Sequence, residues 1–168
     1  MSYFAGIDYD SNAIHAVTID EDTLQLVDHR RYDLDVGPGD AFDRARRTRD
    51  LLPPRQLWAD TGVLAIGIEE PWTKQLNSLV ALIRVQGAIL SCLPRDLLVI
   101  PFPPNRRAPE GWKALTVGKT NATKDEIRAW AIGTGCPEGL EEDTYDAYAI
   151  AHATAARWQT AARNRRAA

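Results

Sequence analysis

Four acidic residues stand where elements of secondary structure are expected to begin or end. Asp143 and Asp146 open an alanine-rich stretch, DTYDAYAIA at 143–151, which is typical of a helix. A spacing of three residues would put both carboxylates on one face of its first turn. Asp8 and Glu69 each follow an apolar run of strand length, FAGI and LAIGI. A carboxylate at the end of a buried strand is costly unless it is paired or binds a cation.

Carboxylate oxygens are the ligands that hard divalent cations such as Mg²⁺ prefer. Two such ions about 3.5 to 4 Å apart can clamp the attacking and leaving oxygens of a phosphodiester during an in-line displacement. Each acid alone has an ordinary explanation as a turn residue, a strand end or the start of a helix. The four acids together predict a site for Mg²⁺ or Mn²⁺.

Apolar patterning predicts three successive strands, a β-meander, and then strands and helices in alternation. The expected strands are 3–9, 12–20, 24–33, 63–68 and 97–101. The expected helices are 40–52, 74–91, 112–116, 124–133 and 143–160. This order predicts an α/β protein with a five-stranded mixed sheet that is flanked by helices and has its first strand near the centre.

The length of 168 residues suits a single domain, 1–168. The two cysteines, Cys92 and Cys136, lack the spacing of zinc ligands, and we expect packing residues in a reducing cytoplasm. The chain has no apolar run long enough to span a bilayer and no secretory pattern at its start. We therefore expect a cytoplasmic protein without a membrane partner.

The formal net charge of −3 is a weak argument against a nucleic-acid partner, because phosphate binding depends on where cations cluster. Basic residues do occur in groups, although each group alone could be a solvated surface. The groups are Arg44, Arg46, Arg47 and Arg49; Arg106 and Arg107; Lys113, Lys119 and Lys124; and Arg163, Arg165 and Arg166.

Two further patterns are rejected as functional motifs. Gly118-Lys119-Thr120 resembles the end of a P-loop, but Lys113 stands where the first glycine is required. The three histidines are too scattered for metal-ligand spacing, and none is assigned to a metal.

Three acidic segments resemble the motifs of RuvC-type Holliday junction resolvases, which have the RNase H-like nuclease fold. The segments are GID at 6–8, AIGIEEPW at 65–72 and DTYDAYAIA at 143–151. WKALTVGKTNATK at 112–124 is similar to the basic segment of the family, with two lysines eleven residues apart. LIRVQGAIL resembles the helix through which the family dimerises, so the resemblance covers nearly the whole chain.

The resemblance implies a crossover junction endodeoxyribonuclease that binds two Mg²⁺ or Mn²⁺ ions per active site. The implied metal ligands are Asp8, Glu69, Asp143 and Asp146. A water molecule activated by metal would attack the scissile phosphorus. The implied substrate is a four-way DNA junction, with other branched DNA as a plausible second class.

The same resemblance implies the DNA contacts. Lys113 and Lys124 would neutralise the reacting phosphate, and Trp72 would stack on an unpaired base. We expect Lys119, Arg106 and Arg107 to add DNA contacts. Because two symmetric cuts require two active sites, we also expect a homodimer formed through helix 74–91.

The chain departs from the family pattern at two places. Tyr9-Asp10 replaces the usual Pro-Gly and is expected to add a carboxylate near the site. Tyr145 and Tyr148 stand in the last helix where small residues are usual.

Three alternatives stay open. The first is a nuclease of the same fold that acts on RNA–DNA hybrids or structured RNA, against which the lysine pair and Trp72 argue. The second is a non-catalytic DNA-binding module, against which the four acids argue. The third is a fragment of a sugar or acetate kinase-like protein, which would require a second domain and glycine-rich phosphate loops.

Overall fold

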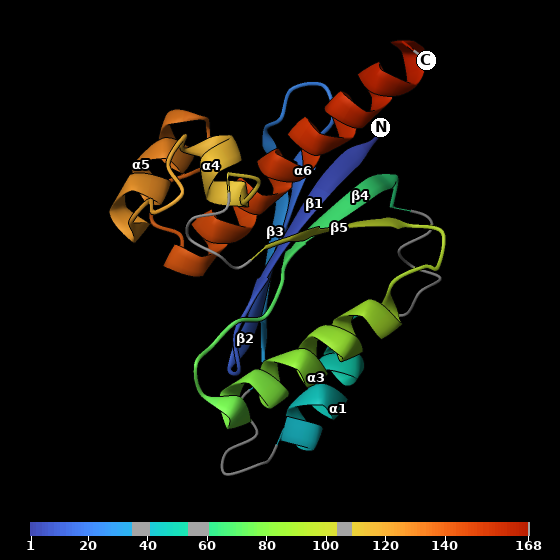
Figure 1. Ribbon diagram of the computed structural model, residues 1–168, viewed down its shortest axis with the longest axis vertical. Coiled ribbons are helices and arrows are strands. Elements are labelled where there is room, and N and C mark those ends of the chain that lie inside the picture. The colour runs from blue at the N-terminus through green and yellow to red at the C-terminus, as the bar shows by residue number, and fades with distance from the viewer. Residues whose placement is uncertain (35–40, 54–60, 104–108, 168) are drawn as a thin grey trace.

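The computed structural model describes residues 1–34, 41–53, 61–103 and 109–167 (Figure 1). The strands in these ranges are β1 (Tyr3–Tyr9), β2 (Ala13–Asp20), β3 (Leu26–Asp33), β4 (Val63–Glu69) and β5 (Leu98–Phe102). The helices are α1 (Ala41–Leu51), α3 (Leu76–Cys92), α4 (Trp112–Thr116), α5 (Lys124–Gly133) and α6 (Glu142–Ala167).

The sheet has the strand order β3-β2-β1-β4-β5, with β1 at its centre. β1 pairs with β2 and β2 with β3 in antiparallel orientation, whereas β1 pairs with β4 and β4 with β5 in parallel. The predicted mixed five-stranded sheet with helices on its faces is therefore confirmed.

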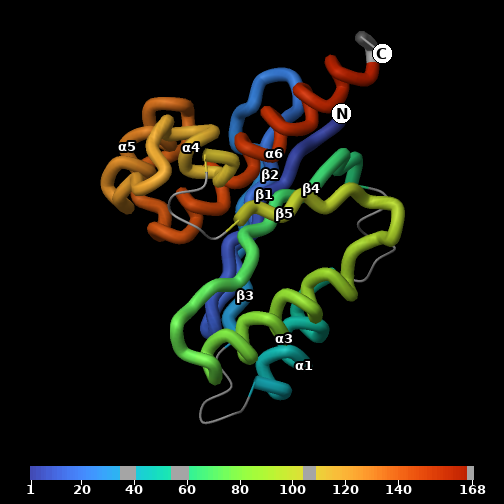
Figure 2. The backbone as a smooth tube through the Cα atoms, in the orientation of Figure 1, coloured from blue at the N-terminus to red at the C-terminus, as the bar shows by residue number. Residues whose placement is uncertain are grey.

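Helices cover both faces of this sheet and enclose two apolar cores (Figures 1 and 2). On one face, α6 crosses β1, β2 and β4, with α4 and α5 packed beside it. Phe4, Phe102 and Trp112 lie in that core. On the other face, α3 contributes Val85 and Ile89 to the second core, and α1 lies alongside α3.

A pair of glycines lets α6 approach the sheet closely. Gly6 of β1 and Gly67 of β4 are neighbours in the parallel register. A Cβ atom on Gly6 would collide with the backbone of Ala147 and Ala151, and one on Gly67 would collide with the side chain of Thr154. Only glycine at these two positions leaves room for the helix at its observed distance.

Local hydrogen bonds fix the turn after β1 and the start of α5. One carboxylate oxygen of Asp10, Oδ1, accepts from the backbone N–H groups of Asn12 (2.6 Å) and Ala13 (2.8 Å) in the turn after β1. Thr123 and Glu126 form a capping box at the start of α5. Such reciprocal bonds satisfy backbone donors that a helix start otherwise leaves unpaired.

The apolar residues of α3 point in two directions. Ala81, Val85, Ala88, Ile89 and Cys92 are buried, and three of them, Val85, Ile89 and Cys92, belong to the core beneath the sheet. A second stripe of apolar residues lies on the outside of the helix. Its exposed members are Leu76 (73%), Val80 (36%), Ile83 (50%) and Leu90 (40%). The helix therefore carries more apolar surface than the sheet covers.

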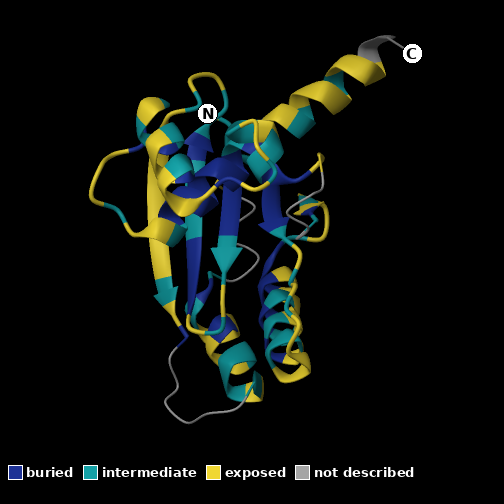
Figure 3. Ribbon diagram, turned by 60° about the vertical axis from the view of Figure 1, so that its left-hand side comes forward, coloured by how far each residue is buried: buried dark blue, intermediate teal, exposed yellow. Residues whose placement is uncertain are grey.

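One further difference concerns the last helix of the chain. α6 continues to Ala167 rather than ending near residue 160, and its last turns project beyond the sheet (Figure 3).

Both cysteines are buried and free, as expected for packing residues. Among the described helices, none combines the length and apolar character needed to cross a membrane.

We predict that Gly6→Ala destabilises the protein by at least about 1 to 3 kcal/mol, the usual cost of overpacking, because its methyl group meets the backbone of α6. Urea unfolding measures the change. Gly133→Ala is the matched control, since a Cβ there meets nothing within 4 Å, and it should be neutral or stabilise α5 by up to about 1 kcal/mol. Equal stability of Gly6→Ala and wild type would contradict the close packing.

Candidate active site

Two of the predicted acids end neighbouring strands at the same edge of the sheet. Asp8 lies one residue before the end of β1, and Glu69 is the last residue of β4. β1 and β4 are parallel, and Ile7 lies opposite Ile68, so both acids emerge at the carboxyl ends of adjacent strands. In open α/β sheets, this is the edge where binding sites usually form.

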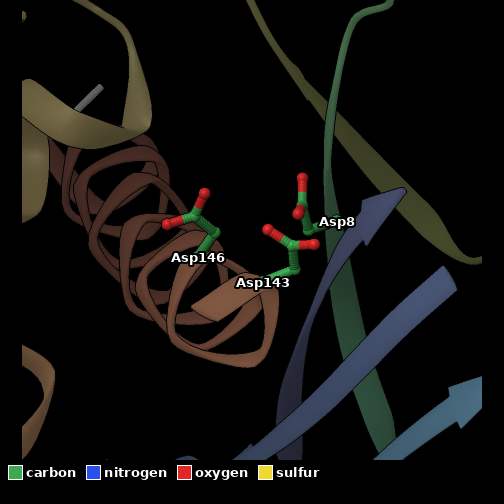
Figure 4. A group of neighbouring side chains, drawn as sticks. All are labelled: Asp8, Asp143 and Asp146. Atoms are coloured by element: carbon green, nitrogen blue, oxygen red, sulfur yellow. The ribbon is translucent and has the colours of Figure 1, made fainter. Parts of the chain in front are cut away.

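The first turn of α6 brings the other two acids to this edge. Asp143 and Asp146 project from the helix towards Asp8, as Figure 4 shows. Carboxylate oxygens of these three aspartates all lie within 4.8 Å of one another. Glu69 lies beside this group and interacts electrostatically with Asp8 and Asp146.

The carboxylates are held together against their mutual repulsion. Burial, followed by the charges of Asp146, Glu69 and Asp143, raises the pKa of Asp8 well above its usual value. Burial also raises the pKa of Glu69 and of Asp146. Such an arrangement disfavours the fully ionised state unless cations are close by.

One cation is supplied by the chain itself. The Lys124 ammonium donates to Asp143 Oδ1 (2.7 Å) and to Asp146 Oδ2 (2.6 Å). Burial opposes its charge, but Asp146 and Asp143 outweigh burial and raise the pKa of Lys124. Lys113 also acts on this group, since its charge lowers the pKa of both Glu69 and Asp146.

The acidic group fits a divalent cation. Its donors are carboxylate oxygens, which Mg²⁺ and Mn²⁺ prefer. Asp146 is only 5% exposed, and its Oδ1 atom finds no hydrogen-bond partner among the described residues. A buried carboxylate oxygen without a partner is costly in a folded protein. A cation between the aspartates would satisfy it.

A cavity of about 150 Å³ opens beside the acids and is lined by Asp8, Tyr9, Glu69 and Trp72, among others. Trp72 is 63% exposed at this position. The side chain of Tyr9 reaches the cavity, and burial together with Glu69 and Asp8 raises the pKa of its hydroxyl group. An exposed aromatic ring next to a carboxylate site suits stacking on a ligand.

Other predicted residues lie elsewhere. Lys119 forms an ion pair with Glu126 of α5 rather than with the acids. Arg106 and Arg107 lie outside the described residues. Asp10, expected to add a carboxylate near the site, accepts hydrogen bonds in the turn after β1 and lines a different cavity with Arg44.

The two tyrosines of α6 have an anchoring role. Tyr145 and Tyr148 are both almost completely buried. The hydroxyl group of Tyr145 donates to the carbonyl oxygen of Pro137 (3.2 Å), and that of Tyr148 donates to the carbonyl oxygen of Thr134 (3.2 Å). Both bonds tie the acid-bearing end of α6 to the segment before it.

Sequence reasoning missed two residues that support the acids. Hydrogen bonding by the indole N–H of Trp112 lowers the pKa of Glu69 and so favours its charged form. His15, opposite Asp8 in the β1–β2 register, lies 3.1 Å from the hydroxyl of Thr144 through Nδ1 and joins β2 to the first turn of α6. Trp112 begins the basic segment 112–124, but only the lysines of that segment were singled out, and His15 belongs to no motif. The sequence therefore did not mark either contact.

Solved structures with this architecture include two of RuvC from Thermus thermophilus. A structure of T. thermophilus RuvC in complex with a Holliday junction substrate superposes with a TM-score of 0.71 and 20% identity, covering 95% of this chain and 98% of that one. The chain has the RuvC fold. A second structure of Thermus thermophilus RuvC gives a TM-score of 0.65 and 20% identity over 94% of this chain and 97% of that one. No family model and no curated protein matches the sequence.

We predict that Asp8→Asn stabilises the metal-free protein, because it removes one of the converging charges. In a chain of this size, each kcal/mol gained raises the melting temperature by roughly 2 to 4 °C. Folding raises the pKa of Asp8, so wild-type stability falls as the pH rises through the folded-state value. The advantage of Asp8→Asn in EDTA should therefore be larger at about pH 8 than at about pH 5.

Added Mn²⁺ should raise the melting temperature of the wild type and leave that of Asp8→Asn nearly unchanged. Asp22→Asn, in an exposed turn, is the control and should behave like the wild type. If Asp8→Asn melts below the wild type in EDTA and still responds to Mn²⁺, the acids do not form a cation site.

Proposed function

We propose that this chain is a metal-dependent, structure-selective endodeoxyribonuclease that resolves four-way DNA junctions by paired, symmetric cuts. The observation that supports it most is the group of three aspartates from β1 and α6, whose oxygens lie within 4.8 Å of one another. The fold it shares with T. thermophilus RuvC, which has been solved with a Holliday junction substrate, supports the choice of DNA substrate.

In this proposal, Asp8, Glu69, Asp143 and Asp146 hold two Mg²⁺ or Mn²⁺ ions. These ions would supply Lewis-acid activation of the phosphodiester and of the attacking water. The backbone positions of the acids are set by the close packing of α6 on β1 and β4, where Gly6 and Gly67 leave no room for a side chain. The electrostatic repulsion among the acids is the reason why the metal-free site is strained.

Two lysines and one tryptophan act on the DNA. Lys124, now shared between Asp143 and Asp146, is close enough to turn to a phosphate once cations neutralise those acids. Lys113 lies on the same side of the site and adds a second point charge. Trp72, exposed beside the acids, stacks on a base that the open junction leaves unpaired. Lys119, Arg106 and Arg107 add contacts to the DNA backbone.

We propose a two-fold symmetric homodimer that forms through the outer face of α3. Leu76, Val80, Ile83 and Leu90 expose apolar surface there, which is unfavourable in water unless a partner covers it. A dimer would provide the two active sites that paired cuts require.

The deciding experiment uses a mobile four-way junction, with each strand labelled in turn, in the presence of Mg²⁺ or Mn²⁺. The wild type should make paired, symmetric nicks. Asp146→Asn should still bind the junction, but it should cut more than about 100-fold more slowly, because even indirect partners of metal ligands change activity about 10- to 100-fold. Asp22→Asn controls for the loss of one carboxylate at an exposed site.

A linear duplex and an RNA–DNA hybrid of the same sequence complete the panel. If the wild type cuts the hybrid but leaves the junction intact, the chain is a nuclease of the same fold with an RNA-containing substrate. If it binds the junction and cuts nothing under any metal condition, it is a binding module. Either result would overturn the proposal.

We predict that Ile83→Glu converts the dimer to a monomer, because it puts a charge at the centre of the exposed apolar face of α3. Sedimentation velocity at micromolar concentration measures the change. Val27→Glu is the matched control, since Val27 is 52% exposed on the edge strand β3. A wild type that sediments as a strict monomer would count against the dimer.

A further inference from the structure

Trp112 occupies an unusual position for a core residue. It is the first residue of the short helix α4 and is 2% exposed, packed in the core between the sheet and α6. Hydrogen bonding by its indole N–H lowers the pKa of Glu69, at the end of β4, against the larger effect of burial. Its ring face meets the ammonium of Lys113, whose Nζ lies 5.0 Å from the ring centre. One buried side chain therefore contacts an acid and a base of the site.

Glu69 needs such support more than the aspartates do. Its side chain has one more rotatable bond than that of aspartate, and the chain leaves regular structure immediately after it. The backbone N–H of Glu70 donates to the carbonyl oxygen of Phe102 (2.9 Å), which fixes the backbone at the strand end but does not involve the side chain of Glu69. A hydrogen bond from a buried donor to one carboxylate oxygen selects a single rotamer and leaves the other oxygen for the site.

We infer that Trp112 is a positioning residue of the acidic site. Its N–H group orients the Glu69 carboxylate towards the aspartates, and its ring face holds the Lys113 ammonium beside them. This inference rests on the proposed metal-dependent function and assigns a role to a residue that contacts neither metal nor DNA.

A purely structural role for Trp112 would predict different contacts and different effects of substitution. A buried indole N–H needs an acceptor, and any backbone carbonyl would satisfy it. Here the partner of the N–H group is an acid of the site, and the ring, although packed in the apolar core, also lies next to a cation. If the role were only structural, Trp112 variants would lose stability without a selective change in metal binding.

The first test measures Mn²⁺ affinity by the loss of the free-ion electron paramagnetic resonance signal. Trp112→Phe keeps an aromatic ring but removes the N–H donor together with the second ring of the indole, and it should weaken Mn²⁺ binding by about 10-fold or more. Trp130→Phe is the matched control, because Trp130 lies on α5 and packs against Tyr148 and His152 of α6. It should bind Mn²⁺ like the wild type.

The second test asks whether the loss passes through Glu69. Glu69→Gln should weaken Mn²⁺ binding by itself, and adding Trp112→Phe to it should weaken binding no further. If the two effects multiply in the double variant, or if Trp112→Phe leaves the affinity unchanged, the inference is wrong. Should Trp112→Phe fail to fold, β-(3-benzothienyl)alanine at position 112 retains the shape of tryptophan without its N–H group and gives the same comparison.

The third test addresses the ring face. Trp112→Leu removes the surface that holds Lys113 and should weaken junction binding in EDTA by about 2- to 5-fold, the size of an exposed cation–π contact. Trp112→Phe retains the ring and should bind the junction like the wild type. Equal junction affinity of all three proteins would show that the ring face does not position Lys113.

These outcomes separate the inference from the proposed function. If the wild type binds Mn²⁺ but cuts no junction, the proposed function fails, and the role of Trp112 still stands or falls on the affinity of Trp112→Phe. If the wild type binds no Mn²⁺, both are overturned.

Discussion

The acidic site depends on how closely α6 approaches the centre of the sheet. Gly6 and Gly67, side by side in β1 and β4, leave space for the helix backbone where any side chain would collide with it. The alanines on the buried face of α6 shorten the distance further. Because Asp143 and Asp146 begin this helix and Asp8 ends the strand beneath it, tight packing forces the carboxylates together.

This packing sets apolar burial against electrostatic repulsion. The buried surface along α6 and the hydroxyl bonds of Tyr145 and Tyr148 hold the end of the helix in position. Like charges a few ångströms apart oppose that position, and Lys124 offsets part of the repulsion. A protein can sustain such a conflict only where the surrounding structure is rigid, which is typical of sites that bind cations or perform catalysis.

The helices on the two faces of the sheet carry different groups of residues. On the α6 face, the segment that contains α4 and α5 brings Trp112, Lys113 and Lys124 to the acids, so cationic and hydrogen-bonding groups surround the carboxylates. On the opposite face, α3 buries one side against the sheet and exposes an apolar stripe on the other. The groups around the acids and the exposed apolar stripe thus belong to different layers of the protein.

The sequence by itself determined the elements and their order, because apolar periodicity, turn residues and capping signals are local properties of the chain. It also marked the acids, since each stands at the end of a strand or the start of a helix. It could not determine the direction of α3, which is apolar on two sides, nor the use of Asp10, which is decided by hydrogen bonds in one turn.

The tertiary structure alone decided which groups meet. The contact of Trp112 with Glu69 and that of His15 with Thr144 join residues far apart in the chain, and neither pair has a characteristic spacing. Likewise, glycine at positions 6 and 67 is meaningful only because a helix from the other end of the chain lies above it. Such contacts depend on the packing of whole elements, which no local pattern encodes.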